Sequence, residues 1–263
     1  MKVTVLGKSP AWQDAGGACS GYLLTEGDTT VLLDCGNGIF AKLREQIDYT
    51  QVDAVVISHM HADHFIDLIP YSYGLLLTPR QQPVPVAGHP GTDDPARPRL
   101  IAPPGAKVAL RTVVGAWGDE QLVEQAFHLE EYDTSSVVEV GPLTFSFAEV
   151  PHFILTHAVN VSTADGRRFT FGADCRPCEE LVDVARDTDL LLVEATLPRP
   201  ERTGIRGHLT PAEAGEHARR AGAKRVVLTH ISDELDAEWA REQGSEAFGS
   251  EVGVAREGDV FDV

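Results

Sequence analysis

The chain has 263 residues, with 22 lysines and arginines against 40 aspartates and glutamates, which gives a formal net charge of −18. Hydrophobic residues make up 43% of it and charged residues 24%, so its composition is that of a globular protein and excludes a mainly disordered or fibrous chain. The acidity argues against an extended, non-specific contact with nucleic acid, because such affinity depends on lysines and arginines that neutralise phosphates. The length suits one large domain or two small ones.

Membrane and disulfide signals are both weak in this sequence. The richest apolar runs, 54–57 and 190–193, are far shorter than the roughly 20 residues that cross a bilayer. The first residues resemble a strand and not a secretory signal, so we expect a cytoplasmic protein with no membrane partner. Four unevenly spaced cysteines indicate reduced thiols, and the pair Cys175 and Cys178 lacks the second pair that a zinc site needs.

Turn formers divide the first half of the chain into short elements. Strands are predicted at residues 3–6, 20–25, 30–33 and 52–58, with a helix at 39–46. The loop 8–17, which contains Trp12, is expected to wall the site described below. Residues 78–105 hold eight of the 16 prolines, which predicts a long surface connection; an inert loop and a lid over the site are both left open. Helices at 108–115 and 119–127 and two strands within 137–150 follow.

The second half repeats the alternation of strand and helix. Strands are predicted at 168–172, 190–194, 226–229 and 259–263, and helices at 178–186 and 211–221, with a further helix in the acidic tail. Thr210 is predicted to cap the helix that begins at Pro211. Strands followed by helices in both halves indicate an α/β protein with two similar layers and the sheets packed inside.

The sequence His59-x-His61-x-Asp63-His64 directly follows a predicted strand. On an α-helix, side chains two residues apart point about 200° away from each other, so the pair of histidines converges only in an extended turn. Crowding three imidazoles and a carboxylate into six residues is unfavourable unless a cation organises them. Such a donor set suits zinc, iron, nickel or manganese.

Four further polar residues lie at or near the ends of predicted strands. They are His152, Asp174, His208 and His230. Each one alone is ordinary, but their shared position, together with the first cluster, indicates one common site.

The order of these motifs, HMHADH, VPH, FGADC, GHLT and LTH, resembles the metallo-β-lactamase-fold hydrolases, in particular the phosphodiesterase branch that includes ribonuclease Z. The resemblance spans most of the chain. It implies a single domain over residues 1–263, an αββα sandwich of two mixed β-sheets flanked by helices, with a binuclear metal site at one edge.

The resemblance also implies a set of metal ligands. One metal would be held by His59, His61 and His152, the other by Asp63, His64 and His230, with Asp174 between them. We expect two divalent ions, zinc first, with manganese or iron as alternatives. Asp34, in the sequence LLDCG, resembles the residue that orients a metal-bound histidine in this family.

Three further residues are interpreted through the same family. His208 resembles a histidine beside the site that binds no metal, and Glu194 resembles the acid of the ribonuclease Z motif His-Glu-Ala-Thr, with Val193 in place of its histidine. His157 stands five residues after His152, where relatives often have tyrosine, and is interpreted as a substrate contact.

We therefore expect a metal-dependent phosphodiesterase. Two metals lower the pKa of a shared water, Asp63 orients the resulting hydroxide, and His208, held by Glu194, protonates the departing alkoxide. A small diester such as a cyclic nucleotide is favoured over large RNA, because the sequence has no base-rich insertion, although an RNA 3′ end remains an alternative. An acyl hydrolase of the same fold, a lactonase or glyoxalase-type thioesterase, and a non-catalytic metal-binding relative stay open, as does a homodimer.

Overall fold

Two mixed β-sheets of seven strands each are formed by residues 1–201 and 203–263, which this computed structural model describes. In spatial order the first sheet contains β14 (Val260–Asp262), β1 (Lys2–Gly7), β2 (Gly21–Glu26), β3 (Thr29–Leu33), β4 (Ala54–Val56), β5 (Arg99–Ala102) and β6 (His128–Glu131). The second contains β13 (Gly253–Val254), β12 (Val226–Thr229), β11 (Leu190–Glu194), β10 (Arg168–Phe171), β9 (Thr156–Thr163), β8 (Leu143–Val150) and β7 (Val137–Val140). From β3 to β6 and from β10 to β13 the strands pair parallel, and the other neighbours pair antiparallel.

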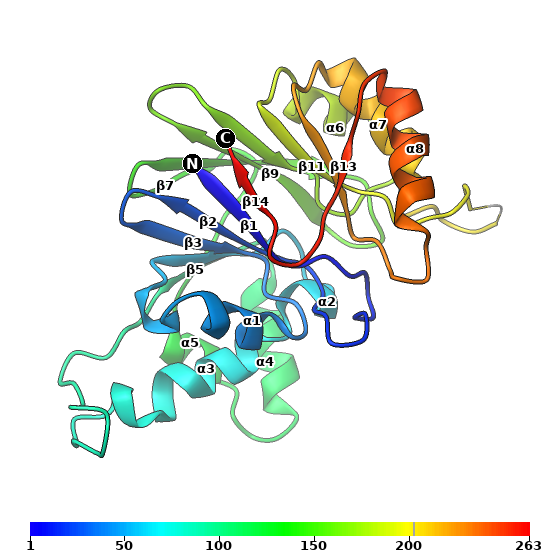
Figure 1. The fold of residues 1–263 in the computed structure, drawn as a ribbon. Helices are drawn as coiled ribbons and strands as arrows, with labels where there is room; N and C mark the ends of the chain where they lie inside the picture. The colour runs from blue at the N-terminus through cyan, green and yellow to red at the C-terminus, as the bar shows by residue number, and fades with distance from the viewer. Residues whose placement is uncertain (202) are drawn as a thin grey trace.

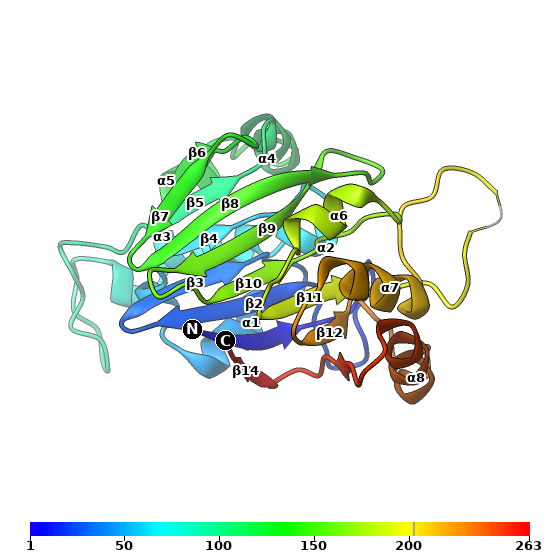
Figure 2. The same cartoon turned by 90° about the horizontal axis from the view of Figure 1, so that it is seen from above.

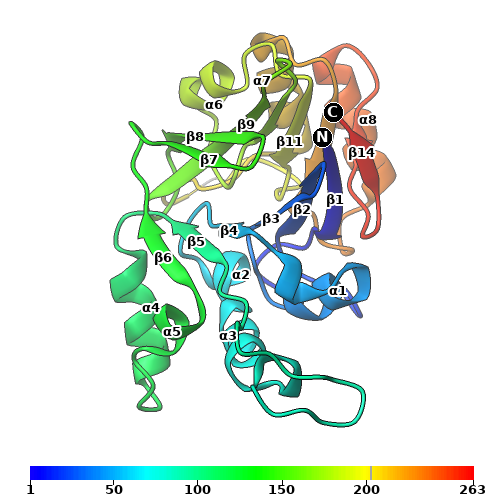
Figure 3. The ribbon, with the colours of Figure 1, turned by 90° about the vertical axis from the view of Figure 1, so that its left-hand side faces the viewer.

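Helices cover the outer face of each sheet (Figures 1 and 3). On the first sheet lie α1 (Ile39–Gln46), α3 (Leu68–Leu77), α4 (Ala106–Gly115) and α5 (Leu122–Ala126). On the second lie α6 (Glu179–Val184), α7 (Pro211–Ala221) and α8 (Ala237–Phe248). Short turns of helix, α2 (Ala62–Phe65), η1 (Tyr49–Gln51) and η2 (Pro79–Gln81), complete the set. The predicted αββα sandwich is confirmed, and the two ends of the chain lie side by side because β1 pairs with β14 (Figure 2).

The alternation of side chains along the strands explains the four layers. In β3, Val31 and Leu33 point between the sheets, whereas Leu32 packs under the helices of the first sheet. In β11, Leu190 and Leu192 point between the sheets, and Leu191 packs under the helices of the second sheet. Strands that are buried on both faces need apolar residues at every position, which is why these segments appear as continuous hydrophobic runs in the sequence.

The proline-rich connection corrects one prediction. Residues 78–105 do not form one surface loop, because β5 lies inside this range and pairs between β4 and β6, with Leu100, Ile101 and Ala102 fully buried. The prolines flank this strand without interrupting it. Since β4 and β5 are parallel, the loop that leads into β5 lies at their amino ends, opposite the edge to which residues 57–64 run (Figure 1). A lid over that edge is therefore excluded for this loop.

Besides β5, the longer elements α3, β6 and β9 have no counterpart in the predicted set, nor do the two-residue strand β13 and the short turns α2, η1 and η2. In β9 the polar residues Asn160 and Ser162 interrupt the apolar pattern, although the strand lies between two neighbours in the sheet. By contrast, α7 begins as predicted, since the Thr210 hydroxyl accepts a hydrogen bond from the Glu213 backbone N–H and Pro211 is its first residue. None of the helices described is long and apolar enough to cross a membrane.

Gly36 lies where the turn after β3 meets α2, and this contact carries a prediction. A Cβ at residue 36 would lie 1.8 Å from the backbone carbonyl oxygen of Asp63, so the chain can approach α2 only without a side chain. We expect Gly36→Ala to lower the free energy of unfolding by about 1–3 kcal/mol and to displace Asp63 and His64. Urea denaturation measures the change in stability, and the amount of bound metal reports the displacement of Asp63 and His64.

Gly253→Ala is the matched control, because its Cβ would meet its nearest neighbour, Val227 Cγ2, at 3.3 Å. A Gly36→Ala protein as stable as this control would show that the close approach does not constrain α2.

Candidate metal centre

Strand ends bring the candidate ligands to one edge of the sandwich. His59 follows β4, His152 follows β8, Asp174 follows β10 and His230 follows β12. These strands come from both sheets, and an isolated bridge between His59 and Thr156 joins the sheets at this edge. The turn of α2 adds Asp63 and His64, with His61 just before it.

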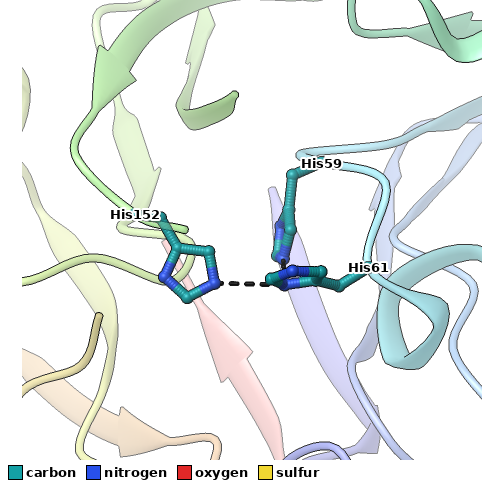
Figure 4. A group of neighbouring side chains, drawn as sticks. All are labelled: His59, His61 and His152. Atoms are coloured by element: carbon teal, nitrogen blue, oxygen red, sulfur yellow. Dashed lines mark hydrogen bonds between the residues drawn. The ribbon is translucent and has the colours of Figure 1, made fainter. Parts of the chain in front are cut away.

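Three histidines form the first group of ring nitrogens (Figure 4). His61 Nδ1 lies 3.2 Å from His59 Nε2 and 3.1 Å from His152 Nε2. The Gly207 carbonyl accepts a hydrogen bond from His152 Nδ1 at 2.8 Å, so the Nε2 atom of neutral His152 carries a lone pair. Burial lowers the pKa of all three histidines, which favours the neutral form that binds metals.

The second group is buried and contains two carboxylates. It consists of Asp63, His64, Asp174 and His230. Asp174 Oδ2 lies 3.4 Å from Nε2 of both His64 and His230, and 3.9 Å from Nε2 of both His59 and His152, so it faces both groups. Burial alone would raise the pKa of Asp174, but the surrounding histidines hold it well below its usual range.

His64 shows that the second group suits a cation. Its Nδ1 donates to Asp34 Oδ2 at 2.7 Å, which leaves a lone pair on Nε2 in the neutral ring. That Nε2 is buried without a hydrogen-bond partner and lies 3.4 Å from carboxylate oxygens of Asp63 and Asp174. A cation between these atoms removes the repulsion, and the nitrogen and oxygen donors match zinc, manganese or iron.

Asp34 holds this histidine in place. Its carboxylate also accepts hydrogen bonds from the backbone N–H and the hydroxyl of Ser58, at 2.8 and 2.9 Å. Asp34 has a left-handed backbone with φ 57°, as do Ala173 (φ 51°) and His230 (φ 56°). Strained positions of this kind persist only where the surrounding structure fixes them, and three of the four described outside glycine lie in or beside this site.

His208 and Glu194 form a pair beside the two groups. His208 Nδ1 lies 2.9 Å from Glu194 Oε1 and 4.0 Å from Asp174 Oδ2. Glu194 is fixed in turn, because it accepts hydrogen bonds from the Cys175 backbone N–H and the Thr196 hydroxyl. Burial alone would lower the pKa of His208, but the hydrogen bond and the charge of Glu194 raise it to about 9.

The structure places His157 elsewhere, which corrects its interpretation as a substrate contact. Its side chain is 2% exposed and packs edge-on against Tyr132, with ring centroids 5.1 Å apart. Successive side chains of a strand point to opposite faces: Ala158 packs under the helices of the second sheet, whereas Val159 and, two residues earlier, His157 point into the core between the sheets. A substrate cannot reach this ring.

A cavity of about 280 Å³ opens onto the second group and His208. Pro10, Ala11 and Trp12 line it, so the loop after β1 does wall the site. Phe153 and Thr196 also line it, and neither was predicted from the sequence, although Phe153 directly follows His152. A larger hollow of about 620 Å³ lies by the end of α1, where Arg80 and Asp48 pair with one another.

Known proteins resemble this chain in both sequence and fold. A family model described as the beta-lactamase superfamily domain matches residues 29–231. The probable metallo-hydrolase YhfI of Bacillus subtilis is 27% identical over all of both chains. Ribonuclease Z of Myxococcus xanthus is 30% identical over 98% of this chain and 96% of its own. The crystal structure of YhfI superposes with a TM-score of 0.83, at 24% identity, over 99% of this chain and 98% of YhfI. The chain therefore belongs to the metallo-β-lactamase superfamily of metal-dependent hydrolases and is related to ribonuclease Z.

Proposed function

We propose that this protein is a binuclear metal-dependent phosphodiesterase that acts on small phosphodiesters. The observation that carries the proposal is the pair of His208 and Glu194, which lies against Asp174 at the cavity. This pair offers a proton donor beside the two groups of candidate metal ligands. Ribonuclease Z is among the relatives. This similarity supports the choice of a phosphodiester over other substrates of metal-dependent hydrolases.

The proposed ligands follow the two groups of side chains. His59, His61 and His152 would hold one metal and Asp63, His64 and His230 the other, with the Asp174 carboxylate facing both. Two divalent ions, zinc first, would lower the pKa of a shared water and neutralise charge on the phosphoryl oxygens.

The side chains of the cavity would then position and protonate the reacting groups. Asp63, which is buried and lines the cavity, would orient the attacking water by accepting its hydrogen bond. His208, whose pKa the hydrogen bond and the charge of Glu194 raise, would donate its proton to the departing alkoxide. Glu194 would keep the ring in place through its contact with Nδ1, so that Nε2 carries the transferred proton.

The cavity also supports a small substrate. Its volume of about 280 Å³ lies just under the usual range for binding a drug-sized molecule. Within the described part of the chain, its lining includes no lysine or arginine that would bind the successive phosphates of a polynucleotide. We therefore propose a cyclic nucleotide or a similar diester in preference to large RNA.

The first test compares His208→Ala with wild type on two diesters. A cyclic nucleotide must lose an alkoxide, which needs a proton, whereas bis(p-nitrophenyl) phosphate loses nitrophenolate, which leaves readily without one. We expect His208→Ala to lower kcat about 100-fold or more for the cyclic nucleotide and much less for the nitrophenyl ester, with bound metal unchanged. Glu194→Gln should have a smaller effect in the same direction.

His128→Ala is the control, because His128 is exposed on β6. Loss of metal from His208→Ala would make this histidine a ligand and overturn its assignment as the acid. Wild-type protein reloaded with zinc or manganese is also assayed on a lactone and a thioester. Turnover of these substrates alone would assign the chain to the acyl hydrolases of this fold, and full metal occupancy without any turnover would indicate a non-catalytic relative.

Asp34 provides a test of the ligand set. Asp34→Asn replaces one carboxylate oxygen with an N–H donor. At the Oδ1 position this donor meets the backbone N–H of Ser58, and at the Oδ2 position it meets the Nδ1–H of His64 and the Ser58 hydroxyl. We expect the affinity for zinc to fall about 10-fold to 100-fold, as measured by competition with a chelator. Asp53→Asn is the control, since Asp53 accepts a hydrogen bond from the Thr30 backbone far from the ligands. Equal zinc affinity in both variants would contradict the role of Asp34.

A further inference from the structure

Two large aromatic side chains are exposed where the cavity opens. Trp12 is 52% exposed and Phe153 is 49% exposed, and both line the same cavity as Asp174 and His208. Exposed apolar surface at a cavity marks a binding site, because its contact with water is unfavourable until a ligand covers it. Neither ring belongs to the candidate metal ligands or to the proposed acid, His208.

The segments that position His152, a candidate ligand, and His208, the proposed acid, also hold Phe153 in place. Its ring lies beside those of both His152 and His208, with centroids 4.8 and 5.9 Å away, and the two imidazoles are themselves 5.0 Å apart. A Cβ at residue 207 would lie 2.2 Å from the Phe153 ring, so only glycine lets the ring lie there. The Gly207 carbonyl also accepts the hydrogen bond from His152, and thus one short segment sets the positions of both side chains.

Trp12 lies on a loop that is attached to the segment after His230. The backbone N–H of Ile231 donates to the Lys8 carbonyl at 3.0 Å, and Lys8 Nζ donates to the Ile231 carbonyl at 2.8 Å. Lys8 also pairs with Asp14, so the loop is fixed on both sides of Trp12 and the charge of this lysine is neutralised. The loop therefore holds Trp12 near the second group of candidate ligands.

The shape and chemistry of this surface fit a planar ring. Beside the two aromatic residues, the apolar part of the lining consists of the small residues Pro10, Ala11 and Ala62; the polar part consists of Thr196, His208 and four of the candidate ligands. A nucleobase stacks on aromatic side chains through its π-face, which every base has, and such contacts need no specific hydrogen bonds. A phosphate at the metal groups leaves the organic part of the substrate against these residues.

We propose that Trp12 and Phe153 form the surface that binds the base of a mononucleotide-type substrate. The inference rests on the proposed function, because it places the phosphate of the substrate at the metal groups. It assigns specificity to residues that take no part in metal binding or proton transfer.

The test compares two ligands that differ only in the base. Adenosine 5′-monophosphate and ribose 5-phosphate share the sugar and the phosphate, so their affinities for the metal-loaded protein, measured by calorimetry, isolate the contribution of the ring. We expect the nucleotide to bind about ten-fold or more tightly. Equal affinities would overturn the proposal, whatever the result of the hydrolysis assays.

Variants then locate the contact. Trp12→Ala and Phe153→Ala should remove the difference between the two ligands while zinc content and melting temperature stay unchanged, and Trp12→Phe should restore most of it. Trp117→Ala is the matched control, because Trp117 is 51% exposed and its indole donates to Tyr73 on the helical side of the first sheet. A preference for the nucleotide that survives both alanine substitutions, or that Trp117→Ala also removes, would overturn the assignment.

Discussion

The site depends on the contacts of the Asp174 carboxylate with the surrounding histidines. Its Oδ2 lies within 3.4–4.0 Å of ring nitrogens from five histidines, at positions 59, 64, 152, 208 and 230. A buried negative charge of this kind is unfavourable unless it is paired or binds a metal ion. Because the partners come from both sheets, the two sheets must meet at this edge, and the hydrophobic layer between them fixes their distance. The apolar core and the polar site therefore constrain each other.

Backbone geometry shows how firmly this arrangement is held. Asp34, Ala173 and His230 each adopt a left-handed conformation, which is unfavourable by about 1–3 kcal/mol for a residue other than glycine. Each lies just after a buried strand, β3, β10 or β12, where the ladder ends and the chain must turn toward the metal groups. The strands are apolar and largely buried, and their packing stabilises these turns, which position Asp34, Asp174 and His230.

The candidate ligands could be predicted from the sequence where they form a short motif. The cluster from His59 to His64 is recognisable because such crowding is unfavourable without a cation, and single residues at strand ends gained meaning from this cluster. The face to which a side chain points was not predictable in the same way. His157 and Phe153 both lie near His152 in the chain, yet the strand pairing of β9 buries the first and the absence of a side chain at Gly207 leaves the second at the cavity. Likewise, β5 is short and lies among prolines, and only its neighbours in the sheet identify it as a core strand.

The site divides into a rigid part and a part carried by loops. The candidate ligands lie mainly at strand ends and on α2, whereas the surface that we propose for the organic part of a substrate comes from the loop after β1 and from residue 153. The segment of Gly207 and His208 joins the two parts, since it seats Phe153, accepts the hydrogen bond of His152 and presents the proposed acid. A substrate ring bound against Phe153 would therefore lie at a fixed distance from the proton on His208. The proposed surface and the proposed acid would be separate side chains that one segment positions, so a change at Gly207 would alter both.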